Sequence, residues 1–222
     1  MTTKPRGRFI TLEGGDGAGK TVQARRLEGR LAELGHQTLR TREPGGSAGA
    51  EALRNVILSG AAAAFSPMTQ TLLFAAARVD HLDKTILPAL ESGRWVVCDR
   101  FADSTRAYQG GRAGMSEFIL SIERLTVGAN GPDLTLILDI SPEAGLARAA
   151  ARRPAGAPAD PFESEGVGFH EALRRRFLAI AAAEPGRCVV IDASGTEDEV
   201  ADAIWSAVVA RLDPSAGRRP GP

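Results

Sequence analysis

The chain has 222 residues, of which 43% are hydrophobic, and its 27 lysines and arginines balance 27 aspartates and glutamates. This length and apolar content suit one globular domain with a buried core. Zero formal net charge argues against a general nucleic-acid or membrane-surface binder, and no apolar run approaches the 18 residues of a membrane span. We therefore expect a cytoplasmic protein in which Cys98 and Cys188 are reduced core residues, not a disulfide pair.

The stretch at 8–27, RFITLEGGDGAGKTVQARRL, reads as a strand, a glycine loop and the start of a helix. Its loop matches G-x-x-x-x-G-K-[ST] at every fixed position, and the flanking strand and helix disfavour a chance glycine turn. Glycines let backbone N–H groups point at a phosphate, while Lys20 reaches the β- and γ-phosphates and Thr21 offers a hydroxyl to Mg²⁺. The predicted phosphate-binding residues are Gly14, Gly15, Asp16, Gly17, Ala18, Gly19, Lys20 and Thr21.

A strand at 38–41 leads into the turn 42–46, Arg-Glu-Pro-Gly-Gly, which is a candidate ligand loop or a plain surface turn. Helices are predicted at 48–59 and 67–92, and Pro88 should kink the second or end it early. Phe74 and Arg78 share one face of that helix. Together they could stack a base and hold a phosphate, although a core residue beside a solvated charge is the commoner arrangement.

The apolar strand at 95–98 ends at Asp99, and an acid in that place is the Mg²⁺-side partner that a phosphate loop needs. The strand at 134–138 ends at Asp139 in the same way, so the pattern alone does not choose between them. Between these strands, residues 103–114 read as a polar, glycine-rich loop that could hold a second substrate, followed by a helix at 116–127.

Further helices are predicted at 142–152, 169–183 and 197–212, with a last strand at 188–191. Arg148, Arg152 and Arg153 cluster where the first of these helices ends, either to stabilise phosphate charge or to favour the helix C-terminus. The proline-broken segment after them reads as a mobile lid. We predict a three-layer α/β fold with a mostly parallel sheet. Its predicted parts are a flexible tail at 1–7, one domain at 8–212 with a lid at about 153–168, and a disordered tail at 213–222.

Five segments together resemble bacterial thymidylate kinases, and the resemblance covers roughly residues 8–212. They are GGDGAGKT at 14–21, TREPGG at 41–46, FAAARVDH at 74–81, DRFADSTRAYQGG at 99–111 and PDLTLILD at 132–139. The resemblance implies a P-loop NTPase fold with a five-stranded sheet. It also implies transfer of the ATP γ-phosphate to dTMP with Mg²⁺, giving dTDP and ADP, by a homodimer that binds neither nucleic acid nor membranes.

The resemblance further implies roles for single residues. The loop 14–21 and Arg148 would bind ATP, Thr21 and Asp99 would hold Mg²⁺, and Lys20, Asp99, Arg100, Arg152 and Arg153 would be catalytic. The implied dTMP site comprises Asp16, Arg42, Phe74, Arg78, Arg100, Ser104, Thr105, Tyr108 and Gln109. Within it, Asp16 would accept a hydrogen bond from the 3′-hydroxyl, Phe74 would stack on thymine, and Tyr108 would occupy the place of a ribose 2′-hydroxyl.

The lid departs from the family pattern. Members whose phosphate loop lacks a basic residue, as here at Gly17-Ala18, carry a D-R-F/I-E run, whereas this chain has Asp160-Pro161-Phe162-Glu163. Arg152 or Arg153 would then substitute for the missing arginine, or turnover would be reduced. Two alternatives remain: another nucleoside monophosphate kinase, since one methyl group is worth only about 1–3 kcal/mol of discrimination, and a non-catalytic nucleotide-binding protein. A GTPase is disfavoured because the sequence has no N-K-x-D motif.

Overall fold

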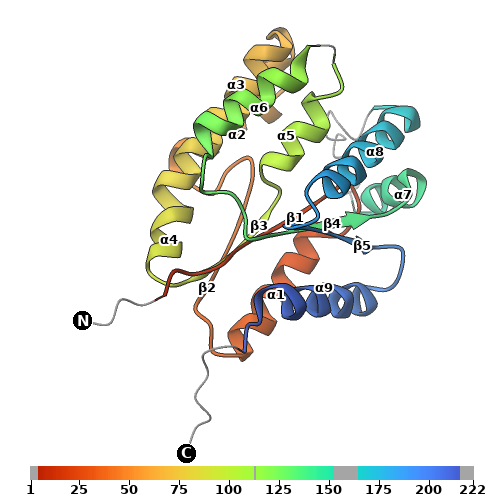
Figure 1. Cartoon of the computed structure of the whole chain (residues 1–222). Helices are drawn as coiled ribbons and strands as arrows, with labels where there is room; N and C mark the ends of the chain where they lie inside the picture. Colours follow the sequence, from red (N-terminus) through yellow and green to blue (C-terminus); the bar gives the residue numbers. More distant parts are fainter. Residues whose placement is uncertain (1–4, 113, 153–164, 216–222) are drawn as a thin grey trace, which may run out of the picture.

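A five-stranded parallel sheet forms the centre of the molecule, with helices on both of its faces (Figure 1). The computed structural model describes residues 5–112, 114–152 and 165–215. The strands are β1 (Phe9–Gly14), β2 (Thr38–Arg42), β3 (Trp95–Asp99), β4 (Leu134–Asp139) and β5 (Cys188–Asp192), in the spatial order β2-β3-β1-β4-β5. All four neighbouring pairs are parallel. The predicted three-layer α/β fold is therefore confirmed.

The helices follow the predicted pattern except at residues 102–109. They are α1 (Lys20–Glu33), α2 (Ala48–Leu58), α3 (Pro67–His81), α4 (Leu87–Glu91), α5 (Ala102–Gln109), α6 (Met115–Thr126), α7 (Pro142–Arg152), α8 (Val167–Ala183) and α9 (Glu197–Leu212). Helices α1 and α9 cover one face of the sheet, and α4, α5 and α8 cover the other, with α2, α3 and α6 packed together beside them (Figure 1). None of the described helices is long and apolar enough to cross a membrane.

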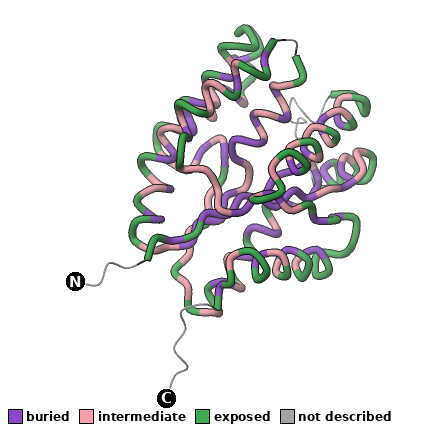
Figure 2. Tube along the Cα trace, in the orientation of Figure 1, coloured by how far each residue is buried: buried purple, intermediate pink, exposed green. Residues whose placement is uncertain are grey.

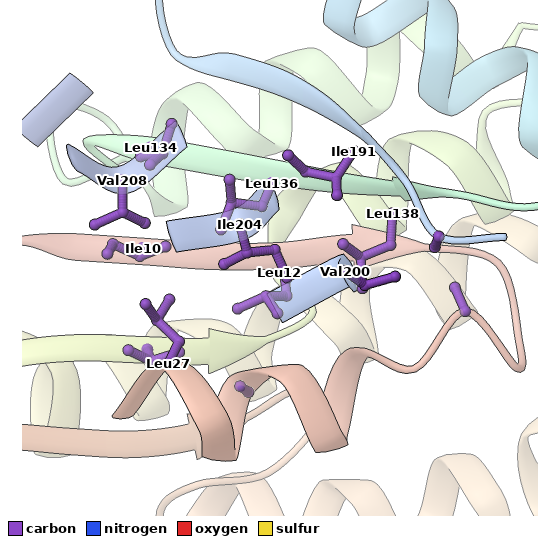
Figure 3. Close-up of a cluster of buried hydrophobic side chains, with 14 of the residues drawn as sticks. Ile10, Leu12, Leu27, Leu134, Leu136, Leu138, Ile191, Val200, Ile204 and Val208 are labelled. Carbon is purple, nitrogen blue, oxygen red and sulfur yellow. The ribbon is translucent and has the colours of Figure 1, made fainter. Parts of the chain in front are cut away.

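Strand alternation decides which side chains reach which layer, because successive residues of a strand point to opposite faces. Ile10 and Leu12 of β1 pack with Leu136 of β4 and Ile204 of α9 in the larger core cluster (Figure 3). Phe9 points the other way, into a cluster with α4. Burial is accordingly concentrated along the strands, and the outer faces of the helices are exposed (Figure 2).

The helix predicted at 67–92 is interrupted at the expected place. Helix α3 ends at His81, the segment Leu82–Ile86 is a π-helix, and α4 follows, with Pro88 in its first turn. Proline has no N–H group and its ring collides with the carbonyl four residues earlier in a regular α-helix. The wider π-turn removes that conflict without ending the helical path.

The polar loop predicted at 103–114 is wrong over most of its length, because residues 102–109 form helix α5. Ala107 is fully buried and packs with Phe177 and Leu173 of α8. The local sequence around Ala107 gives no sign of this apolar contact, because the partner residues come from a distant helix. Tertiary packing therefore overrides a weak local helix signal. The expected lid lies largely outside the described residues, which resume at 165, and Arg153, Asp160, Pro161, Phe162 and Glu163 fall in that gap.

Parallel strands bring their carboxyl ends to one edge of the sheet. Gly14 of β1 lies opposite Leu138 of β4, and Arg42 of β2 lies opposite Asp99 of β3. The glycine loop, the turn after β2 and the segment after β3 consequently meet at this edge, which is where ligands bind in open α/β sheets.

Candidate active site

A cavity of about 370 Å³ opens at the carboxyl edge of the sheet. Its walls come from the glycine loop, the turn after β2, α3 and α5. All nine residues predicted for the acceptor line it: Asp16, Arg42, Phe74, Arg78, Arg100, Ser104, Thr105, Tyr108 and Gln109. Thr21 and Asp99 line it as well, so the two predicted metal ligands face the same space. Segments far apart in the sequence thus form one site.

The glycine loop curls between β1 and α1. Gly17 has φ +74°, and a Cβ there would lie 1.8 Å from the carbonyl oxygen of Gly145 in α7, so this position has no room for a side chain. Lys20 is buried, and its ammonium donates to the carbonyl oxygens of Gly14 at 3.0 Å and Gly15 at 2.6 Å. Burial, together with the charge of Arg100, lowers the pKa of Lys20 to about 8. The loop therefore holds the ammonium group of Lys20 against its own backbone carbonyl oxygens.

Strands β3, β4 and β5 all end in an aspartate, and the surroundings of the two predicted candidates, Asp99 and Asp139, differ. The hydroxyl of Thr21 donates to the carboxylate of Asp99, which places both oxygens at the entrance of the cavity. Asp139 instead accepts two hydrogen bonds from Arg174 of α8, at 2.6 and 2.8 Å. Asp99 is therefore the acid that is hydrogen-bonded to the glycine loop, a choice that the strand pattern alone left open.

Arg100 links the loop to the cavity. It donates to the carbonyl oxygen of Gly14 at 3.2 Å, to Asp16 at 2.6 Å and to the Tyr108 hydroxyl at 3.1 Å. The Tyr108 hydroxyl in turn donates to the second oxygen of Asp16 at 2.9 Å. Burial opposes ionisation of Asp16, but the charges of Arg100 and Lys20 outweigh it and hold the pKa of Asp16 below its usual value. Burial raises the pKa of Tyr108, so its hydroxyl remains a donor.

Arg78 is a buried part of the cavity wall and not a solvated charge beside a core residue. Its Nε donates to Glu43 at 2.8 Å, and a terminal nitrogen donates to the Thr105 hydroxyl at 3.0 Å and the Phe101 carbonyl at 3.1 Å. The sequence reading missed Glu43 and His81, which complete this network. Glu43 is 3.2 Å from His81 Nδ1, and the other nitrogen of that ring is 2.7 Å from the hydroxyl of Thr41.

Glu13 is not among the site residues expected from the sequence, although an acidic residue within the mostly apolar run FITLEG could have indicated it. Its side chain is fully buried at the end of β1 and accepts hydrogen bonds from the backbone of Phe101 and from Ser104. Burial, joined by the charge of Asp103, raises the pKa of Glu13 to about 8. This carboxyl group belongs to the frame behind the cavity, since it does not line the cavity itself.

The remaining predicted cations differ in their surroundings. Arg42 lines the cavity and pairs with Glu51 at 3.0 Å in an exposed ion pair. Arg148 donates to the carbonyl oxygens of Ala193, Ser194 and Gly195, at 2.8, 2.9 and 3.3 Å, and so ties α7 to the loop before α9. Arg152 is exposed at the end of α7, and Arg153 lies outside the described residues.

Comparisons of the sequence and of the structure with known proteins point to one family. The family model described as thymidylate kinase matches residues 12–204. The thymidylate kinase of Bradyrhizobium diazoefficiens is 54% identical over 211 residues, covering 95% of this chain and 92% of the relative. That of Caulobacter vibrioides is 53% identical over 207 residues, covering 93% and 98%. The crystal structure of thymidylate kinase from Ehrlichia chaffeensis superposes with a TM-score of 0.71 at 32% identity, covering 92% of this chain and 99% of that one.

The buried pair of Arg78 and Glu43 generates a stability prediction. Glu43→Ala should lower the free energy of unfolding by about 3–5 kcal/mol, because it leaves the Arg78 charge buried without its partner. Urea unfolding followed by circular dichroism measures the change.

Glu28→Ala is the matched control, since Glu28 pairs with Arg40 at 2.9 Å with both side chains at least 30% exposed. Loss of this exposed ion pair should lower the free energy of unfolding by at most about 1 kcal/mol. Equal losses in the two variants would show that the Arg78 network is not closed to water.

Proposed function

The chain belongs to the thymidylate kinase family, and we propose that the cavity at its sheet edge holds dTMP with the phosphate directed at the glycine loop. It is an ATP-dependent phosphotransferase that converts dTMP to dTDP. The observation that carries the proposed site is the meeting of the glycine loop, the turn after β2, α3 and α5 around one cavity. A second nucleotide can thus lie next to the loop that binds the phosphates of the first.

The reaction needs charge neutralisation more than proton abstraction. The acceptor phosphate has a second pKa of about 6, so it is largely a dianion at pH 7 and needs no strong general base. Two anions must be held in line while negative charge shifts between them. Lys20 and the loop N–H groups serve the donor side in this proposal, and Arg100 bridges to the acceptor through its position between Gly14 and Asp16.

We assign Thr21 and Asp99 to the Mg²⁺ that accompanies ATP. Both offer oxygen atoms, the ligands that Mg²⁺ prefers, and they lie side by side at the cavity. Within residues 5–112, 114–152 and 165–215, no group of three or more His, Cys, Asp or Glu side chains could hold a metal alone. This donor set fits Mg²⁺ bound mainly by substrate phosphates, where it would neutralise charge on the transferred group.

The acceptor's sugar and base would meet opposite walls of the cavity. Phe74 of α3 would stack on thymine, and Arg78, held by Glu43 and Thr105, would meet the edge of the base or the phosphate. Asp16 would accept the hydrogen bond of the 3′-hydroxyl, and the ring of Tyr108 would exclude a 2′-hydroxyl. Ser104, Thr105 and Gln109 of α5 would complete the base site, with Arg42 at the phosphate end.

The lid cation of this chain is proposed to come from the end of α7. Arg148 is already bound to three backbone carbonyls, which suits it to shape the loop beside ATP. Arg152 is exposed one helical turn further on, where its side chain is available to a bound nucleotide. In this proposal it supplies transition-state charge together with Arg153, which lies outside the described residues.

We further propose that the enzyme is a cytoplasmic homodimer. Cys98 and Cys188 are both free and buried, as expected of a protein from a reducing compartment. Helices α2, α3 and α6 pack together (Figure 1). Exposed apolar side chains on these helices, with Phe65 just before α3, support self-association, and we call them the apolar patch. Its members are Val56, Phe65, Met68, Leu72 and Leu120, which are 37–50% exposed.

A coupled ADP-release assay with ATP and a panel of nucleoside monophosphates tests the function. The wild-type enzyme should prefer dTMP, and Lys20→Ala should keep its circular dichroism spectrum while losing at least about 100-fold in kcat, because the loop loses its phosphate-facing cation.

A preference for AMP, CMP or GMP would make the chain a different monophosphate kinase, and no acceptor-dependent turnover would make it a nucleotide-binding protein. Near-normal turnover by Lys20→Ala would remove Lys20 from the phosphate site.

Tyr108 generates a prediction about sugar selectivity. Tyr108→Ala should raise kcat/KM for the ribonucleotide form of the acceptor relative to dTMP by about tenfold, because space opens where the 2′-hydroxyl would clash. Tyr108→Phe keeps the ring and should keep the selectivity. Kinetics with both acceptors measure the ratio, and an unchanged ratio in the alanine variant would remove Tyr108 from the sugar site.

The apolar patch predicts the oligomeric state. Leu72→Asp should shift the enzyme from dimer to monomer, because a charge at the centre of an apolar contact is costly to bury. Light scattering during size-exclusion chromatography gives the mass. Val209→Asp is the control, since Val209 is 41% exposed on α9, which covers the opposite face of the sheet. A wild-type monomer, or a dimer that survives Leu72→Asp, would contradict the proposed interface.

A further inference from the structure

Glu13 is a carboxylic acid placed one residue before the glycine loop, on a strand that is otherwise apolar or neutral. Strand alternation turns Glu13 away from the α1 side, toward the face that α5 covers. Its Oε1 accepts from the backbone N–H of Phe101 at 2.7 Å and of Ser104 at 3.2 Å, and its Oε2 accepts from the Ser104 hydroxyl at 2.6 Å. A buried acid is thus directed entirely at one short segment, the start of α5.

The start of α5 lacks a capping side chain of its own. Its N-cap residue is Phe101, which makes no side-chain capping bond because its ring has no acceptor. The first N–H groups of a helix have no partner within the helix, so they must be satisfied from elsewhere when buried. Glu13 supplies that acceptor from a neighbouring strand. Its Oε1 keeps both backbone bonds whether or not Oε2 carries a proton.

The hydrogen bond between Phe101 and Glu13 lies next to a residue with an unfavourable backbone conformation. Arg100 has φ +69°, in the left-handed region that non-glycine residues rarely occupy. Its own N–H donates to the carbonyl oxygen of Leu12 at 2.9 Å, and the next N–H, of Phe101, donates to Glu13. Both anchors belong to β1. A conformation of this kind persists only where the surrounding contacts hold it firmly.

We propose that Glu13 is a positioning residue for the acceptor nucleotide, which fixes the turn at Arg100 and the start of α5 against the base of the glycine loop. Glu13 does not line the cavity, so it acts through Arg100 and Ser104, which do. It thereby keeps the groups that face dTMP in a constant position relative to those that face ATP. This inference rests on the proposed acceptor site.

Three variants separate positioning from simple structural support. Glu13→Leu removes both acceptors at similar volume, and Glu13→Gln keeps one acceptor oxygen. Thr11→Val is the matched control, because Thr11 is fully buried on the same strand and face but bonds Thr135 of β4 at 2.8 Å and not α5.

In Glu13→Leu, KM for dTMP should rise about tenfold or more and kcat should fall, while KM for ATP stays within about twofold. Glu13→Gln should recover part of the loss, and Thr11→Val should match the wild type. Should Glu13→Leu fail to fold, the comparison of Glu13→Gln with Thr11→Val carries the test. A lowered melting temperature with both KM values unchanged, or an equal rise in both, would overturn the proposal.

Hydrogen exchange gives a readout that does not depend on turnover. The amides of Phe101 and Ser104 should exchange at least about tenfold faster in Glu13→Leu than in the wild type, and near the wild-type rate in Glu13→Gln, which keeps one acceptor oxygen, and in Thr11→Val. Unchanged exchange would show that Glu13 does not hold α5. Faster exchange with unchanged KM for dTMP would show that it holds the helix without positioning the acceptor, which also overturns the proposal.

Discussion

The contact between Arg100 and the end of β1 is the interaction on which the site depends. Its guanidinium reaches Gly14, Asp16 and Tyr108 at once, so one side chain touches the glycine loop and the opposite wall of the cavity. Phosphoryl transfer requires two anions close together, and their repulsion must be met by cations that are already in place. A cation held on several sides loses little freedom when the substrates arrive.

Holding such cations in a buried site requires acids around them. Arg78 is matched by Glu43, and Arg100 by Asp16. A buried charge without a partner costs several kcal/mol, so each arginine of the cavity needs a fixed acceptor. The acceptors also align the guanidinium groups, because an arginine bound through Nε can rotate very little. Charge compensation and orientation of these two arginines therefore come from the same bonds.

The elements that the sequence predicted well are those with a strong local signal. The glycine loop has a fixed spacing, and the helix at 142–152 has proline at its start and ends where the structure has it end. Helix α5 was taken for a loop because its polar face is the cavity wall and its apolar contacts come from α8. Residues chosen for a ligand do not show the apolar period of a packed helix. The weakest structural prediction therefore falls within the proposed site.

By itself the sequence determined the phosphate loop and the α/β class with a mostly parallel sheet, since each depends on local pattern or motif spacing. The family resemblance named eleven residues that line the cavity, but not Glu43, Pro44, Arg54, Leu58 or Phe101. The tertiary structure alone decided between Asp99 and Asp139, because both end strands that neighbour β1, and the packing of α1 against β3 puts Thr21 beside Asp99. It alone revealed Glu13 and Glu43 as acceptors for groups more than thirty positions away. Such pairings depend on how strands and helices pack, and no local pattern records them.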